Sequence, residues 1–194
     1  MSEDRSKGKR LIPIPEALLN GLMQASSKEG KPLNRYVEDA LRQAVRVFKA
    51  GQDLAGMVRY FEILQSQKAS GAVFTPLIVF DFLIKEAYTT DKEKLMSVWF
   101  ESGKWYGKYL TEKFANPVQS LADLLKAARW DLNEVDVKEI DGKIKFRCTS
   151  TALSNEGTEL LLEFIEGALT GMDYKTVKSE FMKGLVIIEF VLCT

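Results

Sequence analysis

The stretch of sequence that decides the N-terminal fold runs from Lys9 to Lys49 and reads KRLIPIPEALLNGLMQASSKEGKPLNRYVEDALRQAVRVFK. It opens with a short apolar run typical of a strand, and two helical patterns follow, separated by residues 29–34. A single strand has no partner inside so short a segment, and two short helices bury little apolar surface. The segment therefore predicts self-pairing, in which a second copy of the chain completes both the sheet and the core.

This segment resembles the ribbon-helix-helix DNA-binding domain of the MetJ, Arc and CopG type, without a gap over residues 9–48. The resemblance rests on the strand end Ile14-Pro15-Glu16, the Leu18/Leu19/Leu22 stripe, the Glu29-Gly30 stop, the Asn34 helix start and the Val37-x-x-Ala40-Leu41 register. In such proteins the strands of two chains pair as an antiparallel ribbon that enters the major groove of DNA. The resemblance implies a homodimer with DNA as its partner.

The start of the second helix carries the chemistry of a phosphate contact. Asn34 is predicted to be its N-cap, which leaves the N–H groups of Arg35 and Tyr36 free to bind an anion, helped by the Arg35 charge. Lys7 and Lys9 add positive charge ahead of the strand. These residues are expected to supply most of any DNA affinity.

The strand itself offers little for reading bases. Counting back from Ile14 with period two places Lys9, Leu11 and Pro13 on the face that would meet DNA. Leucine can touch a thymine methyl group, but proline has no donor, so direct readout rests on Lys9. The alternative is a dimerisation ribbon without an operator. A register shift of one residue would instead turn Arg10 and Ile12 toward the groove.

Composition indicates a folded intracellular protein. The chain has 194 residues, of which 46% are apolar, no run approaches the length of a membrane span, and residues 1–8 form no signal-peptide core. We therefore expect a cytoplasmic location. The net charge is zero, with +4 on residues 1–50 and −4 on residues 51–194. That asymmetry suits an N-terminal anion-binding module, although solvated faces show similar scatter.

Histidine is absent, and Cys148 and Cys193 have no neighbouring ligands, so no metal site is expected. The two cysteines are either reduced thiols or a single disulfide, with reduced thiols as the cytosolic default. Without histidine the chain lacks the usual general base and every Ser-His or Cys-His arrangement. We accordingly expect no catalytic residues, no cofactor and no enzyme activity.

Further elements follow the second helix. A helix capped by Asp53 runs to Gln67, and another is expected from Thr75-Pro76, with Thr75 as N-cap. Further helices are expected over residues 92–114, with Asp91 as N-cap, and over residues 120–128 and 156–170. Alternating runs at 135–140 and 143–148 flank an Asp141-Gly142 turn, and strands are expected at 176–182 and 185–193, the last of them central in an antiparallel sheet. Glycine pairs four residues apart, Gly103/Gly107 and Gly167/Gly171, predict close approach of another backbone.

Residues 72–194 resemble the 4-vinyl reductase domain, also called the hydrocarbon-binding domain, which is similar to subunits of the TRAPP transport particle. The resemblance rests on the element order, on Glu-x-Gly-x-x-Tyr-Gly at Glu101 to Gly107 and on Phe-Ile-x-Gly-x-x-x-Gly at Phe164 to Gly171. It implies an α/β fold, often dimeric, with an apolar pocket for a small molecule or an acyl chain. Phe181 and Ile188 occupy the places where many such domains carry cysteines, so their thiol or metal chemistry is not implied.

Together these patterns predict an α+β protein: a ribbon-helix-helix domain over residues 1–50, a helical connector over 51–71, and over 72–194 a domain with helices packed on an antiparallel sheet. The predicted function is a ligand-responsive DNA-binding transcriptional regulator. Spacing on the long helices predicts a ligand pocket lined by Phe82, Trp99, Trp105 and Phe164, with a filled core as the alternative. A dimeric small-molecule-binding or scaffold protein without DNA binding is the alternative function.

Overall fold

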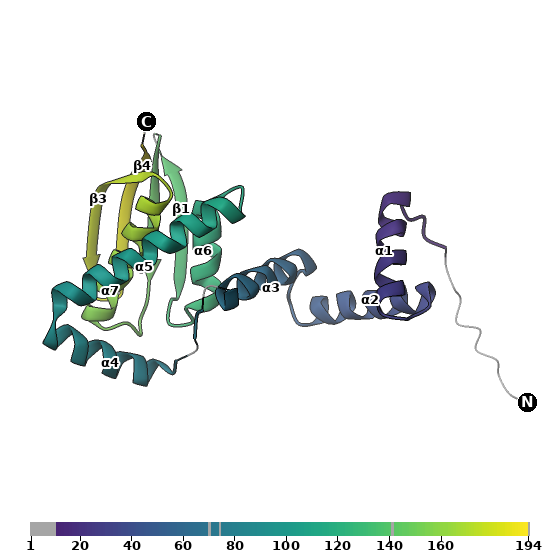
Figure 1. Cartoon of the computed structure of the whole chain (residues 1–194), viewed down its shortest axis with the longest axis horizontal. Coiled ribbons are helices and arrows are strands. Elements are labelled where there is room, and N and C mark those ends of the chain that lie inside the picture. Colours follow the sequence, from purple (N-terminus) through teal and green to yellow (C-terminus); the bar gives the residue numbers. More distant parts are fainter. Residues whose placement is uncertain (1–10, 70, 74, 141, 194) are drawn as a thin grey trace, which may run out of the picture. The chain divides into compact units, whose positions relative to one another are not determined.

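The computed structural model describes residues 11–69, 71–73, 75–140 and 142–193 (Figure 1). The chain divides into two compact units, with the boundary between Arg59 and Tyr60. The predicted DNA contacts Lys7 and Lys9 lie outside the described residues. Among the helices that these residues form, none is both long and apolar enough to cross a membrane.

The first unit contains α1 (Glu16–Lys28) and α2 (Leu33–Lys49), which contact each other, while residues 11–15 lie in neither a helix nor a strand. Helix α1 ends as predicted at Glu29-Gly30, because Gly30 adopts a positive φ of 64° and the following Lys31 N–H donates to the Ser26 carbonyl at 2.9 Å. Of the residues in the two helices, only Ser26 is buried. The helix pair therefore has no apolar core of its own.

Helix α3 (Leu54–Ala69) crosses the boundary between the two units. Its N-terminus is capped as predicted, because the Asp53 carboxylate accepts a 2.7 Å hydrogen bond from the Gly56 N–H. The helix runs two residues past the expected end at Gln67. Ile63 is buried and belongs to the core cluster of the second unit.

The second unit is an α+β domain with helices and a four-stranded antiparallel sheet among its described residues. Its sheet has the order β1-β2-β4-β3, so β4 is central as predicted. After α3, the elements are α4 (Leu77–Thr90), α5 (Lys92–Lys113), α6 (Pro117–Ala128), β1 (Glu134–Ile140), β2 (Lys143–Thr149), α7 (Asn155–Gly171), β3 (Tyr174–Met182) and β4 (Leu185–Leu192).

Two helix starts in this unit differ from the prediction. Thr75 is not the N-cap of α4: Pro76 occupies the cap with an extended ψ of 138°, and the helix begins at Leu77. Helix α6 begins at Pro117, three residues earlier than expected, because the Asn116 side chain accepts a hydrogen bond from the Gln119 N–H at 3.1 Å. The predicted Asp91 cap of α5 is confirmed, with the Lys94 N–H donating to Asp91 Oδ1 at 3.0 Å.

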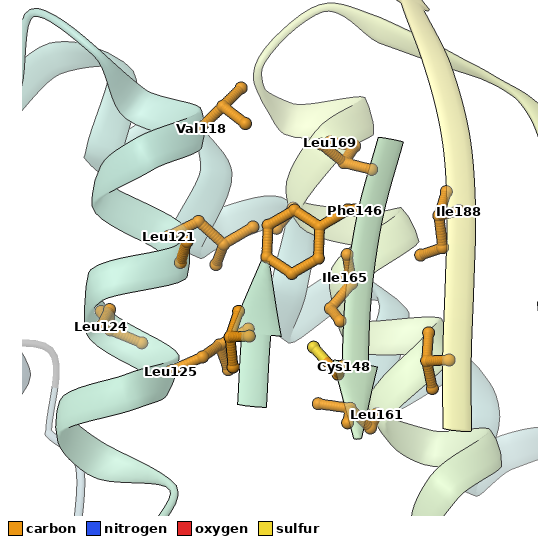
Figure 2. Close-up of a cluster of buried hydrophobic side chains, with 14 of the residues drawn as sticks. Val118, Leu121, Leu124, Leu125, Phe146, Cys148, Leu161, Ile165, Leu169 and Ile188 are labelled. Atoms are coloured by element: carbon orange, nitrogen blue, oxygen red, sulfur yellow. The ribbon is translucent and has the colours of Figure 1, made fainter. Parts of the chain in front are cut away.

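The core lies between one face of the sheet and helices α6 and α7 (Figure 2). Strand alternation creates this face, because buried residues alternate with half-buried ones along most of β2 and β4, and Phe146, Cys148 and Ile188 are among the buried ones. Opposite these residues stand the apolar side chains of α6 and α7: Val118, Leu121, Leu124, Leu125, Leu161, Ile165 and Leu169. The other face of the sheet is half-buried or exposed and carries paired charges.

Helices α5 and α7 cross at the four glycines singled out in the sequence. A Cβ at Gly103 would lie 2.1 Å from the Phe164 carbonyl oxygen, and one at Gly107 would lie 2.0 Å from that of Ala168. The relation is reciprocal, because a Cβ at Gly167 would lie 2.0 Å from the Phe100 carbonyl oxygen. The predicted close approach of another backbone is thus confirmed, and the partners are the two motif helices themselves.

Candidate functional site

The start of α2, the predicted phosphate site, lies two residues earlier than predicted. Pro32 is the N-cap and Leu33 begins the helix, so Asn34 is the second helical residue and not the cap. The N–H groups of Arg35 and Tyr36 both donate to the Pro32 carbonyl at 3.0 Å, so neither is free for an anion. By helix geometry the free donors are the N–H groups of Leu33 and Asn34. The candidate anion site therefore lies at the first two residues of α2, next to the preceding loop.

Every described residue of the predicted DNA-facing strand is exposed. Leu11 is 102% exposed, and Pro13 is exposed as well. Backbone at Pro15 is extended, with φ −55° and ψ 140°. Such a segment is compatible with pairing to another strand, and the single chain supplies none to the described residues 11–15.

Helices α1 and α2 leave a large apolar surface uncovered. We define this unit-1 apolar face by five side chains, each at least half exposed: Leu18, Met23, Leu41, Val45 and Phe48. Phe48 alone is 79% exposed. Leu41, Val45 and Phe48 are spaced four and three residues apart on α2, so they share one side of that helix, and an exposed apolar side of this kind is typical of a protein interface.

In the second unit, the helices α4, α5 and α7 share a chain of aromatic contacts, here called the aromatic cluster: Phe80, Trp99, Phe164, Tyr106, Trp105 and Tyr109. The predicted residues Trp99 and Phe164 meet edge to face with ring centroids 6.4 Å apart. Phe80 packs on Trp99 at 5.9 Å, and Tyr106 packs on Phe164 at 5.6 Å. The structure therefore brings two of the four predicted pocket residues into direct contact and adds Phe80 and Tyr106.

The other two predicted pocket residues lie nearer the surface. Trp105 is 51% exposed and stacks on Tyr109 with parallel rings 5.6 Å apart. Phe82 is 63% exposed, on a side of α4 that also exposes Ile78 and Leu83. The sequence did not separate Phe80 from Phe82, because α4 is apolar almost all round and has no clear polar face.

A shallow hollow of about 250 Å³ lies on the outer face of the sheet, lined by residues of β1 and β2: Asp136, Lys138, Ile140, Lys145 and Arg147. Its charges are paired. Lys138 lies 2.9 Å from Asp136, Arg147 lies 2.8 Å from Glu134, and Lys145 lies 3.4 Å from Glu189. We therefore interpret it as a solvated sheet surface.

One polar network ties the C-terminal end of α4 to α5 and α7. Glu159 accepts hydrogen bonds from the Tyr88 hydroxyl and from Lys92 Nζ, the latter at 2.8 Å. Burial acts to raise the pKa of Glu159, but the hydrogen bonds from Lys92 and Tyr88 together outweigh it, and the pKa is lowered. The Glu159 carboxylate is thus held in its ionised form. The contacts of Glu159 with Tyr88 and Lys92 are here called the α4 latch.

Asp81, in the middle of α4, is the exception among the acidic groups of this region. Its Oδ1 is buried and has no hydrogen-bond partner among the described residues. A buried polar atom left unpaired costs about 1–3 kcal/mol, and more when the group is charged. By contrast, Asp131 takes two hydrogen bonds from Arg129, at 2.8 and 2.6 Å. The sequence does carry a signal for Asp81, because it is the one charged residue in the apolar stretch 77–84.

Both cysteines are free thiols, which excludes the disulfide left open by the sequence. Cys148 is buried in the core, and burial raises its thiol pKa to about 12. Cys193 is exposed near the end of β4.

Comparison with known proteins gives no match in sequence and a loose match in structure. No family model matches the chain, and no curated protein matches it in sequence. Among solved structures, a chain from a study of haem distortion in the H-NOX family superposes with a TM-score of 0.37 and 17% identity, over 65% of this chain and 80% of the other. A superposition this loose supports no inference about fold or function.

Proposed function

We propose that the protein is a ligand-responsive DNA-binding regulator, in which a ribbon-helix-helix dimer of the first unit binds DNA and the second unit senses a small apolar ligand. The observation that carries this proposal is the incomplete first unit. Its helices expose the unit-1 apolar face and follow an extended, exposed segment at residues 11–15. A second copy would cover the helices and pair with that segment, as in the family that the sequence resembles.

DNA contact in this dimer would rest on phosphates. The N–H groups at the start of α2, the Arg35 side chain, and the lysines 7 and 9 would surround the DNA backbone, while Leu11 and Pro13 bring no hydrogen-bond donor to the bases. Binding should then depend steeply on salt and select sequence weakly.

A gel-shift titration at two salt concentrations tests DNA binding. Arg35→Ala should weaken binding on every sequence by a similar factor and reduce the salt slope by roughly one unit for each phosphate that the side chain neutralises. Arg46→Ala, which removes a charge at the opposite end of the same helix, is the matched control and should change the slope less. Failure to bind at low salt would end the regulator proposal, and selection of a long fixed palindrome would show that the strand register is shifted by one residue.

Ligand sensing is assigned to the second unit, at the aromatic cluster beneath α4. A ligand alters DNA affinity only if it binds two arrangements of the dimer unequally, and about 1.4 kcal/mol of difference gives a tenfold effect. Mass spectrometry of gently purified protein and a thermal-shift screen with fatty acids test for an apolar ligand. A protein that carries none and shows no shift has a filled core at this place.

A dimeric binding or scaffold protein without DNA is the second candidate. The exposed Leu11 and the donor-free Pro13 favour it, as does the exposed apolar side of α4. The same gel shift separates the two functions, because a scaffold protein would remain dimeric and leave DNA unbound.

A further inference from the structure

The inner side of α4 combines a buried carboxylate oxygen with aromatic rings. Phe80 packs on Trp99, and Ile84, one turn later, is only 5% exposed, so this side of the helix faces the domain. Asp81 follows Phe80 directly, and its Oδ1 is buried without a hydrogen-bond partner among the described residues. Asp81 Oδ1 is therefore a buried acceptor to which no described residue donates a hydrogen bond.

The aromatic cluster is suited to hold a positively charged partner for Asp81. The faces of aromatic rings are negative, and they attract cations most strongly where water is excluded. The chain already uses one of these rings in this way, because the Arg129 guanidinium lies 5.8 Å from the centroid of Phe80. Arg129 is itself engaged by Asp131 through two hydrogen bonds, so it does not serve Asp81.

We propose that the ligand held beneath α4 is an organic ammonium ion, whose N–H group donates to Asp81 Oδ1 and whose apolar part lies against Trp99 and Phe164. This inference rests on the proposed ligand-sensing function and narrows its ligand from an apolar molecule to one that carries a cationic head. Binding supplies the hydrogen bond that Asp81 lacks, while the rings add the cation–π attraction.

Helix α4 is held to the domain in a way that would let it cover such a site and still move at one end. Its polar contact with α7 lies at the C-terminal end, where Tyr88 donates to Glu159. The opposite half carries Ile78, 81% exposed, and Phe82, 63% exposed, which point largely into solvent. A ligand can therefore enter by displacement of the N-terminal half of α4 while the hydrogen bond from Tyr88 to Glu159 stays intact.

Thermal-shift and calorimetric titrations of the full-length protein test the inference with a matched pair of probes, 2-phenylethylammonium and the neutral 2-phenylethanol. The ammonium should raise the unfolding midpoint saturably and bind at least about tenfold more tightly than the alcohol. Asp81→Asn, which keeps the shape of the side chain, should remove that preference without lowering the midpoint of the free protein. Glu86→Gln, a carboxylate change on the exposed side of the same helix, should leave both affinities unchanged.

Each other result has a defined meaning. Equal binding of both probes, unchanged in Asp81→Asn, would overturn the cation inference and keep the proposed apolar ligand. Ammonium binding that survives Asp81→Asn but disappears in Glu86→Gln would place the cation on the surface and also overturn it. Binding of neither probe at millimolar concentration would overturn it as well, and DNA binding, measured separately by gel shift, would be unaffected by that outcome.

Discussion

Single residues of one type have opposite roles in this chain because their surroundings differ. Cys148 lies in the core between the sheet and α6, whereas Cys193 is exposed. Phe80 packs on Trp99, whereas Phe82, two residues later, is largely exposed. A residue's chemistry here follows from the face on which its element places it.

The two thiols should therefore react in sequence. In the native protein, a thiol reagent such as dithiobis(nitrobenzoate) should label Cys193 rapidly and leave Cys148 unlabelled, because burial excludes the reagent and raises the Cys148 pKa to about 12. Two equivalents should react after unfolding in denaturant. The variant Cys193→Ser should show no rapid phase, and a rapid phase that persists in it would contradict the burial of Cys148.

At the scale of elements, the crossing of α5 and α7 organises the second unit. Four glycines let the two backbones touch, so that α7 can pack its opposite side on the sheet. Helix α4 is attached to this pair by its aromatic and apolar side chains and by the latch at Glu159. The crossing is tightly packed, while the outer side of α4 remains uncovered.

Replacement of Gly107 by alanine should therefore cost about 3 kcal/mol of unfolding free energy or more, because the new Cβ would lie 2.0 Å from the backbone oxygen of Ala168. Denaturant unfolding monitored by tryptophan fluorescence measures this. Ser102→Ala, an exposed change on the same helix, should stay within about 0.5 kcal/mol of the wild type. A tolerated Gly107→Ala would mean that the helices do not approach at this point.

The latch should make the docking of α4 sensitive to acid. The Glu159 pKa is lowered below its ordinary 4.5, so its stabilising effect is present above pH 4.5 and disappears as the pH falls through the lowered value. At neutral pH, Glu159→Gln should lower the unfolding free energy by about 1 kcal/mol. The difference between the variant and the wild type in thermal unfolding should shrink as the pH falls below 4.5. A difference that stays constant with pH would show that the ionised form of Glu159 does not stabilise α4.

At the scale of the whole molecule, the two units differ in how complete they are. The second unit has a sheet, covering helices and a contiguous core, whereas the helices of the first bury almost nothing. In the proposed dimer, the first unit would gain most of its stability from association, since isolated short helices are marginal in water.

Disruption of the unit-1 apolar face should therefore dissociate the dimer that we propose. Leu41→Asp combined with Val45→Asp places two charges on this face, and sedimentation velocity should then report a monomer at concentrations where the wild type is a dimer. Gln43→Asp, an exposed polar position on the same helix, should leave the dimer intact. If the double variant stays dimeric, the interface lies in the second unit instead.

The sequence by itself determined most element boundaries, because local chemistry sets them. Asp53 and Asp91 cap their helices where expected, Gly30 ends α1, and a nearly continuous apolar run marks the central strand β4. The glycine spacing predicted a close backbone approach. Each of these signals acts within a few residues of chain, so it can be read without the fold.

Only the tertiary structure decided which surfaces meet. Pro32 and Pro76 could each have been a first helical residue or an N-cap, and the choice depends on the ψ angle with which the chain enters each helix. The partner of each glycine row, the packing of Phe80 in place of Phe82, and the burial of Asp81 Oδ1 depend on how α4, α5 and α7 pack together. Local sequence patterns could not predict these contacts, because an apolar helix has several faces that could be buried and the packing of neighbouring elements decides which one is.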